Sequence, residues 1–153
     1  MMRRAVICMT VFAFVVLVAG YSVQAATQAD AKAMVEKAVA YWKANGKEKA
    51  IAEFNNPTGQ FVKGDLYVFA NQLDGLVLAN GGNPKLAGQN HMELKDPTGK
   101  QFNKESAELA KTKGSGWIDY EWVNPVSKKL QPKTVWVQRV EGTDVYIGSG
   151  IWK

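Results

Sequence analysis

The chain has 153 residues, with 19 basic and 14 acidic side chains and a single cysteine. This length fits one globular domain. Because 46% of the residues are hydrophobic and 10% are aromatic, the chain can bury a core and does not have the composition of a disordered tail.

The N-terminus has the pattern of a secretory signal. Arg3 and Arg4 precede a continuous apolar run over residues 5–19, and Val23-Gln24-Ala25 supplies small residues at the cleavage positions. The run is shorter than the roughly 20 residues that span a bilayer, although retention as a membrane anchor is the alternative. We therefore expect a signal peptide at residues 1–25, cleavage after Ala25, and a periplasmic or secreted protein.

Cleavage at this point would remove Cys8 together with Arg3 and Arg4, so that the formal charge falls from +5 to +3. A chain without cysteine has no disulfide, no zinc–thiolate site, no haem attachment and no thiol catalysis. The remaining charge is small and spread along the chain, which argues against a nucleic-acid partner. No motif indicates a cofactor.

The first part of the mature chain is predicted to be helical. Thr27 is a suitable N-cap, and apolar residues then recur at helical spacing until Asn45-Gly46 gives a stop signal. A short second helix is expected over residues 47–54, before Asn55-Asn56-Pro57-Thr58-Gly59 breaks the chain.

The rest of the chain is predicted to consist mainly of strands. Residues 65–70 and 75–79 flank a turn at Asp74-Gly75 and form an expected hairpin. A loop-rich stretch follows, and a third helix is expected over residues 101–112. Three further strands, at 117–123, 133–140 and 145–152, close the chain. This order predicts one α+β domain at residues 26–153, built on an antiparallel sheet.

The alternation of side chains along the late strands predicts a ligand-binding face. Tyr120 and Trp122 share one face of their strand, while Trp117 takes the other. Gly148 and Gly150 alternate with larger residues in the last strand. Glycine weakens a strand, so close approach of a ligand or of another backbone would explain them. We expect a floor without side chains, surrounded by aromatic residues.

Polar groups on these strands suit a small organic acid. The ammonium group of Lys133 is able to pair with a carboxylate, and the hydroxyl groups of Tyr120 and Tyr146 are able to donate hydrogen bonds to it. The alternative from composition alone is that these aromatic residues are simply core and rim.

Several segments together resemble the single Cache domain of the second type. They are GKEKAIAEFN at 46–55, FVKGDLYVF at 61–69, NPKLAGQN at 83–90, GSGWIDYEWVNP at 114–125, Pro132-Lys133 and GSGIW at 148–152. Their order and spacing cover residues 31–153, which is nearly all of the mature chain. The resemblance implies a PAS-like extracytoplasmic sensor fold, with a long N-terminal helix packed on a five-stranded antiparallel sheet.

In this family the pocket lies on the sheet face opposite the long helix, under the segment after the hairpin. The resemblance therefore implies seven ligand-binding residues: Tyr67, Phe69, Trp117, Tyr120, Trp122, Lys133 and Tyr146. Two positions depart from the family pattern, since Asn80 stands where a histidine is common and Trp136 where a tyrosine is common.

The resemblance also implies a partner. Such domains belong to chemoreceptors and histidine kinases, but we expect no second span or signalling module after the last strand, which ends near Lys153. We therefore expect a module that binds a small organic acid, a short carboxylate, and presents it to a membrane histidine kinase or chemoreceptor. A homodimer through the N-terminal helix is a further possibility.

Two other classes of function are alternatives to a ligand-binding module. An enzyme is not favoured, because His91 is the only histidine, no nucleophile elbow or phosphate loop is present, and Asp119 and Glu121 are expected at a solvated strand edge. The other alternative is a protein–protein docking module without a small ligand, which would use Trp152 and the edge of the last strand.

Overall fold

The computed structural model of the chain describes residues 25–153. Apart from Ala25, the expected signal peptide lies outside these residues. Residues 25–153 form three helices: α1 at Gln28–Asn45, α2 at Lys47–Phe54 and α3 at Phe102–Lys113. A single 3-10 turn, η1, covers Pro84–Leu86. Each predicted helix is present within one residue of its expected bounds.

The strands form one antiparallel sheet. They are β1 at Val62–Lys63, β2 at Leu66–Gln72, β3 at Val77–Asn80, β4 at Ser115–Val123, β5 at Leu130–Arg139 and β6 at Val145–Trp152. The strand order is β1-β2-β6-β5-β4, and β3 pairs with β2. The expected hairpin is therefore β2–β3, and the five predicted strands are all present. The two-residue strand β1 was not predicted.

Strand β5 begins earlier than predicted, on the far side of Pro132. The carbonyl of Pro132 accepts a hydrogen bond from the Lys153 amide at 2.9 Å, which places the proline nitrogen just beyond the end of β6. Strand β6 pairs with β5 only from Lys133 onward, so the missing N–H removes no bond of the ladder.

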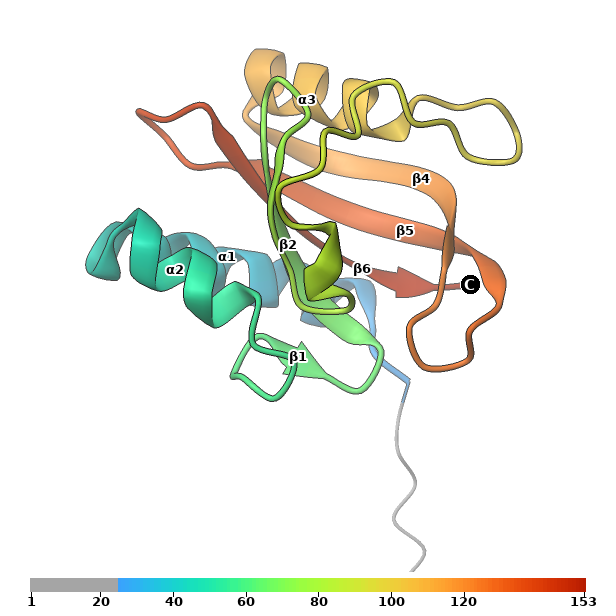
Figure 1. Cartoon of the computed structure of the whole chain (residues 1–153), viewed down its shortest axis with the longest axis horizontal. Coiled ribbons are helices and arrows are strands. Elements are labelled where there is room, and N and C mark those ends of the chain that lie inside the picture. Colours follow the sequence, from blue (N-terminus) through green and yellow to red (C-terminus); the bar gives the residue numbers. More distant parts are fainter. Residues whose placement is uncertain (1–24) are drawn as a thin grey trace, which may run out of the picture.

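One face of the sheet is covered by α1 and α2, which lie together on that side (Figure 1). Thr27 caps α1 as predicted, and the Asp30 carboxylate accepts a hydrogen bond from the Thr27 amide in return. The core on this side contains the apolar stripe of α1, Phe54 and Phe61, and the residues of β2 and β6 that face the helix.

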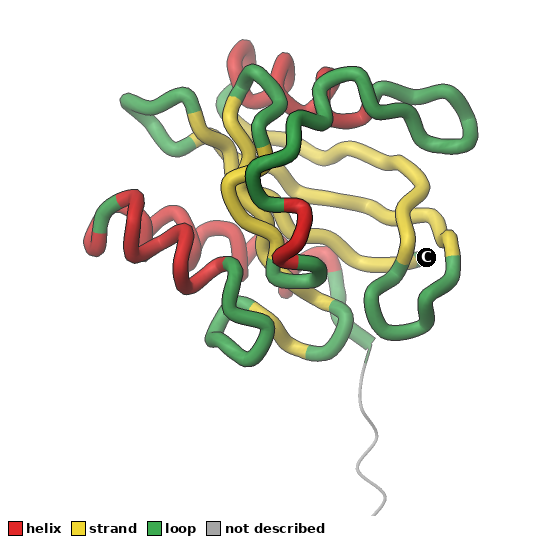
Figure 2. Tube along the Cα trace, viewed as in Figure 1, coloured by secondary structure: helices red, strands yellow, loops and turns green. Residues whose placement is uncertain are grey.

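The opposite face of the sheet has its own core. Helix α3 packs mainly on β4, and Phe102, Ala107 and Ala110 join Ile118 and Tyr120 there. The segment between β3 and α3 crosses this side of β2 and is mostly loop, with η1 as its single helical turn (Figures 1 and 2). The sheet thus separates a helix-covered face from a face covered by α3 and a loop. This is the predicted α+β, PAS-like arrangement.

Candidate ligand-binding site

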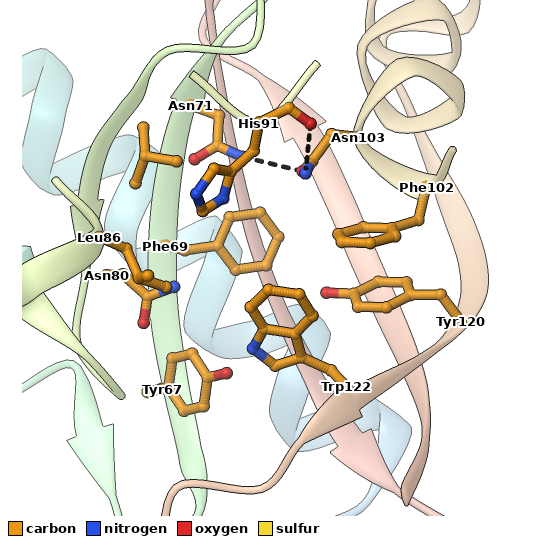
Figure 3. A pocket seen from close by; sticks show the side chains of 11 residues that line it. Tyr67, Phe69, Asn71, Asn80, Leu86, His91, Phe102, Asn103, Tyr120 and Trp122 are labelled. Carbon is orange, nitrogen blue, oxygen red and sulfur yellow. Dashed lines mark hydrogen bonds between the residues drawn. The ribbon is translucent and has the colours of Figure 1, made fainter. Parts of the chain in front are cut away.

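A small cavity lies on the sheet face opposite α1, under the segment between β3 and α3 (Figure 3). Its volume is about 30 Å³, which is enough for a water-sized group. A larger occupant would therefore require the surrounding side chains to move. The cavity is lined by Tyr67, Phe69, Asn71, Val77, Asn80, Leu86, His91, Phe102, Asn103, Tyr120 and Trp122.

The structure brings four of the seven predicted residues directly to this cavity: Tyr67, Phe69, Tyr120 and Trp122. Tyr146 lies on the same face, where its ring meets Phe69 edge-on and its hydroxyl contacts Asn71. The ring of Trp117 lies on the other face, in edge contact with Trp136 at 5.2 Å between centroids. Trp117 therefore does not line the cavity, and ligand contact by the other residues remains a prediction.

Lys133 lies behind the cavity wall rather than on it. Its side chain is 1% exposed, and its Nζ has no hydrogen-bond partner among the described residues. The Nζ lies 4.0 Å from the ring centroid of Tyr67 and 4.5 Å from that of Trp152. The Trp152 ring is held in place by a hydrogen bond from its Nε1 to the Asp65 carbonyl at 3.1 Å. The cation is thus enclosed by two aromatic faces.

This environment changes the protonation of Lys133. Burial lowers the pKa of the lysine to about 7, although the negative charge of Asp65 acts in the opposite direction. Asp65 forms no ion pair with Lys133 within 4.0 Å; its Oδ2 instead lies 3.4 Å from the Asn124 side-chain amide. A second anion close to Lys133 would therefore restore the charged state.

Three hydrogen-bond donors are free at the cavity. The Tyr67 hydroxyl, the Tyr120 hydroxyl and the Trp122 Nε1 make no hydrogen bond within the described part of the chain, and both hydroxyls point toward the space beside Trp122 (Figure 3). Burial raises the pKa of Tyr67 and of Tyr120, so both hydroxyls stay protonated at neutral pH. None of the eleven lining side chains is acidic. The wall is therefore suited to an anion.

The other end of the cavity is formed by two asparagines and the backbone of His91. The side-chain nitrogen of Asn71 donates to the Tyr146 hydroxyl at 3.2 Å and to Asn103 Oδ1 at 3.3 Å. Asn103 in turn donates to the His91 carbonyl at 3.1 Å. This network was not predicted from the sequence. Asn71 could nevertheless have been identified, because it follows Tyr67 and Phe69 at the strand period of two.

The glycines of β6 do not leave a bare floor. A Cβ at Gly148 would lie 2.8 Å from Cε1 and 2.9 Å from Cε2 of Phe69, and closer still to its Cζ. Gly148 therefore makes room for the Phe69 ring, not for a ligand. At Gly150 a Cβ would meet the backbone of Thr134 and Val135, so close approach of a neighbouring strand explains that residue.

A larger open groove of about 530 Å³ adjoins the cavity. Tyr67, Asn80, Leu86 and Trp122 border both spaces, so these side chains separate the cavity from the outside. Lys85 and Lys128 also line the groove. Their positive charge favours the approach of an anion along this path.

The described residues contain neither a metal-binding cluster nor a membrane-spanning helix. No three His, Cys, Asp or Glu side chains gather there in a way that would hold a metal ion. Within residues 25–153 there is also no helix with the length and hydrophobicity needed to cross a membrane.

The comparisons with known proteins place the chain in a family of sensor domains. The sequence pattern of the Cache domain (dCache_2) matches residues 24–153, so the chain belongs to the Cache domain family. It is also 30% identical over 88 residues to the methyl-accepting chemotaxis protein McpP of Pseudomonas putida. That match covers 58% of this chain but only 16% of McpP, so the chain corresponds to a small part of the receptor.

Solved structures agree with the fold. A periplasmic sensor domain of a chemotaxis protein matches with a TM-score of 0.63 and 25% identity, over 79% of this chain and 86% of that one. A Cache chemosensory domain described for its carboxylic acid recognition matches with a TM-score of 0.63 and 26% identity, over 79% and 84%. A methyl-accepting chemotaxis protein from Vibrio parahaemolyticus reaches 0.68 at 24% identity, over 81% and 86%.

Proposed function

We propose that this protein is an extracytoplasmic sensor-type module that binds a small organic acid in the cavity between β2, β4 and the segment before α3. The observation that carries the proposal is the set of free donors from Tyr67, Tyr120 and Trp122 at a wall without acidic residues, backed by the buried ammonium group of Lys133. A carboxylate accepts hydrogen bonds, and its negative charge complements a wall that has donors and a nearby lysine but no acidic residue.

The family relationship supports this reading. Chemoreceptor domains are among the similar structures, and one of them is described for carboxylic acid recognition. We propose that the bound state is presented to a membrane histidine kinase or chemoreceptor, from a periplasmic or secreted position. Pairing of two copies through α1 is part of the same proposal. Binding, not catalysis, is the activity that the donor set supports.

A thermal-shift panel tests the binding of organic acids. The panel contains acetate, propionate, lactate and pyruvate, with amino acids and purines as unrelated ligands, and uses protein purified from cells that express the full chain. An acid at 100 times its dissociation constant adds about 2.7 kcal/mol to the free energy of unfolding. This raises the midpoint by roughly 10 °C in a domain of this size. A folded protein that responds to none of the acids would favour the docking module instead.

Removing one free donor gives a sharper test. Tyr120→Phe is expected to weaken binding of a responding acid between tenfold and a hundredfold, because one hydrogen bond to a charged group is lost. The free energy of unfolding should hardly change, since the hydroxyl has no partner in the folded protein. Tyr41→Phe, on the α1 side of the sheet, is the matched control. Calorimetric titration measures the affinity of each variant for the acid. If Tyr120→Phe binds as tightly as Tyr41→Phe, the Tyr120 hydroxyl does not contact the ligand.

A further inference from the structure

Asn71 carries a buried acceptor that nothing in the described part of the chain satisfies. The side chain is 4% exposed and lines the cavity, and its Oδ1 has no hydrogen-bond partner there. A buried acceptor without a partner is costly to the folded state. This oxygen and the Nζ of Lys133 are the two buried side-chain polar atoms in this condition.

The orientation of the Asn71 amide follows from its neighbours. Asn103 donates its own side-chain nitrogen to the His91 carbonyl, so its Oδ1 faces Asn71. Asn71 must then present its nitrogen to Asn103, because a reversed amide would place two oxygens against each other. The Oδ1 of Asn71 is therefore the group left over, and it requires a donor.

We infer that the ligand brings this donor as a hydroxyl group, so that the site prefers a short hydroxy acid to the same acid without the hydroxyl. This inference rests on the proposed function, in which the carboxylate meets the tyrosine and tryptophan donors. The occupant is compact, since the cavity is small. An ammonium group is disfavoured as the donor, because the lining offers no carboxylate and already has a lysine behind it.

Comparison of three-carbon acids tests the inference on the unmodified protein. Calorimetric titration would use propionate, pyruvate and the two enantiomers of lactate, with protein from cells that express the full chain. One enantiomer of lactate should bind roughly tenfold tighter than propionate or better, because only the hydroxy acid satisfies Asn71. Pyruvate should bind no tighter than propionate, since its keto oxygen is an acceptor facing an acceptor.

The variant Asn71→Leu assigns the preference to this side chain. It removes the acceptor at similar volume, so the advantage of lactate over propionate should disappear while propionate still binds. Circular dichroism checks that the variant folds. If it does not, the comparison of the four acids on the unmodified protein decides alone.

The outcomes separate the two proposals. Equal affinity of propionate and both lactates for the unmodified protein would overturn the inference and leave acid binding intact. A lactate preference that survives Asn71→Leu would also overturn it, because another group would then be responsible. If none of the four acids binds, the inference fails, and the proposed function fails with it if acetate does not bind either.

Discussion

Lys133→Met is expected to weaken the binding of a short carboxylate between tenfold and a hundredfold while making the folded protein more stable. The affinity falls because the anion loses the only buried cation near its proposed position among the described residues. Calorimetric titration measures this loss. Lys85→Met, which removes a lysine of the outer groove, is the matched control and should change affinity much less.

The stability gain follows from the cost of burying the charge. A pKa of about 7 in place of the ordinary 10.5 corresponds to a burial cost on the order of 4 kcal/mol at pH 7. Methionine carries no charge to bury, so the free energy of unfolding of Lys133→Met should exceed that of the unmodified protein by up to about 4 kcal/mol in urea titration at pH 7.

The same shift predicts how stability depends on pH. Between pH values of about 7 and 10.5 the unfolded lysine holds a proton that the folded one has released, so the unfolded state binds more protons. Stability of the ligand-free protein should therefore rise from about pH 7 to about pH 9. At higher pH the buried tyrosines act in the opposite direction, because unfolded tyrosines release protons near their ordinary pKa of 10.0 while burial raises the pKa of Tyr146 to about 12 and that of Tyr67 and Tyr120 as well. In Lys133→Met this rise should be absent, and an unchanged rise would contradict the assignment.

Gly148→Ala should both destabilise the protein and close the cavity. The added methyl group would occupy space now filled by the Phe69 ring, and this ring is itself a wall of the cavity. Overpacking of this kind costs about 1–3 kcal/mol, and relief requires the ring to move into the ligand space. Urea titration and calorimetry should therefore show lower stability and lost binding in the same variant.

Two further variants control for other causes. Gly116→Ala adds a methyl group in β4 against the flexible end of Leu109, so its effect should be much smaller. The double variant combines Gly148→Ala with Phe69→Leu, which replaces the ring by a smaller side chain. Its loss of stability should therefore be less than the sum of the two single losses. Strict additivity would show that the glycine and the ring do not compete for the same space.

Much of the fold could be predicted from local sequence patterns. The helical spacing of apolar residues after Thr27 shows which side of the helix faces the core, and alternation does the same for the strands. Both patterns can be recognised from the sequence alone. Alternation also placed Trp117 on the face opposite Tyr120 and Trp122, and the structure agrees with it. The family resemblance includes Trp117 among the ligand-binding residues, whereas the structure places it away from the cavity.

The cavity itself was harder to predict, because it depends on residues that meet only in the folded chain. Leu86 and His91 come from the segment between β3 and α3, which is a single 3-10 turn and loop, so no extended periodic pattern tells which way their side chains point. The buried state of Lys133 depends on Tyr67 and Trp152, which belong to two other strands. Likewise, the sequence predicted open space at Gly148, whereas the structure places the Phe69 ring of the neighbouring strand against it.

Ser149 connects α1 to the backbone of Tyr67, whose side chain lines the cavity on the other face. Its hydroxyl donates to the Tyr67 carbonyl at 2.8 Å and lies 3.8 Å from the Met34 sulfur of α1. The ligand face and the helix face are therefore separated by one layer of backbone. Suppose that a ligand binds better to one position of Tyr67 and a partner protein binds better to one position of α1. The two binding equilibria would then be thermodynamically linked. Reciprocity would require each to change the affinity of the other by the same factor.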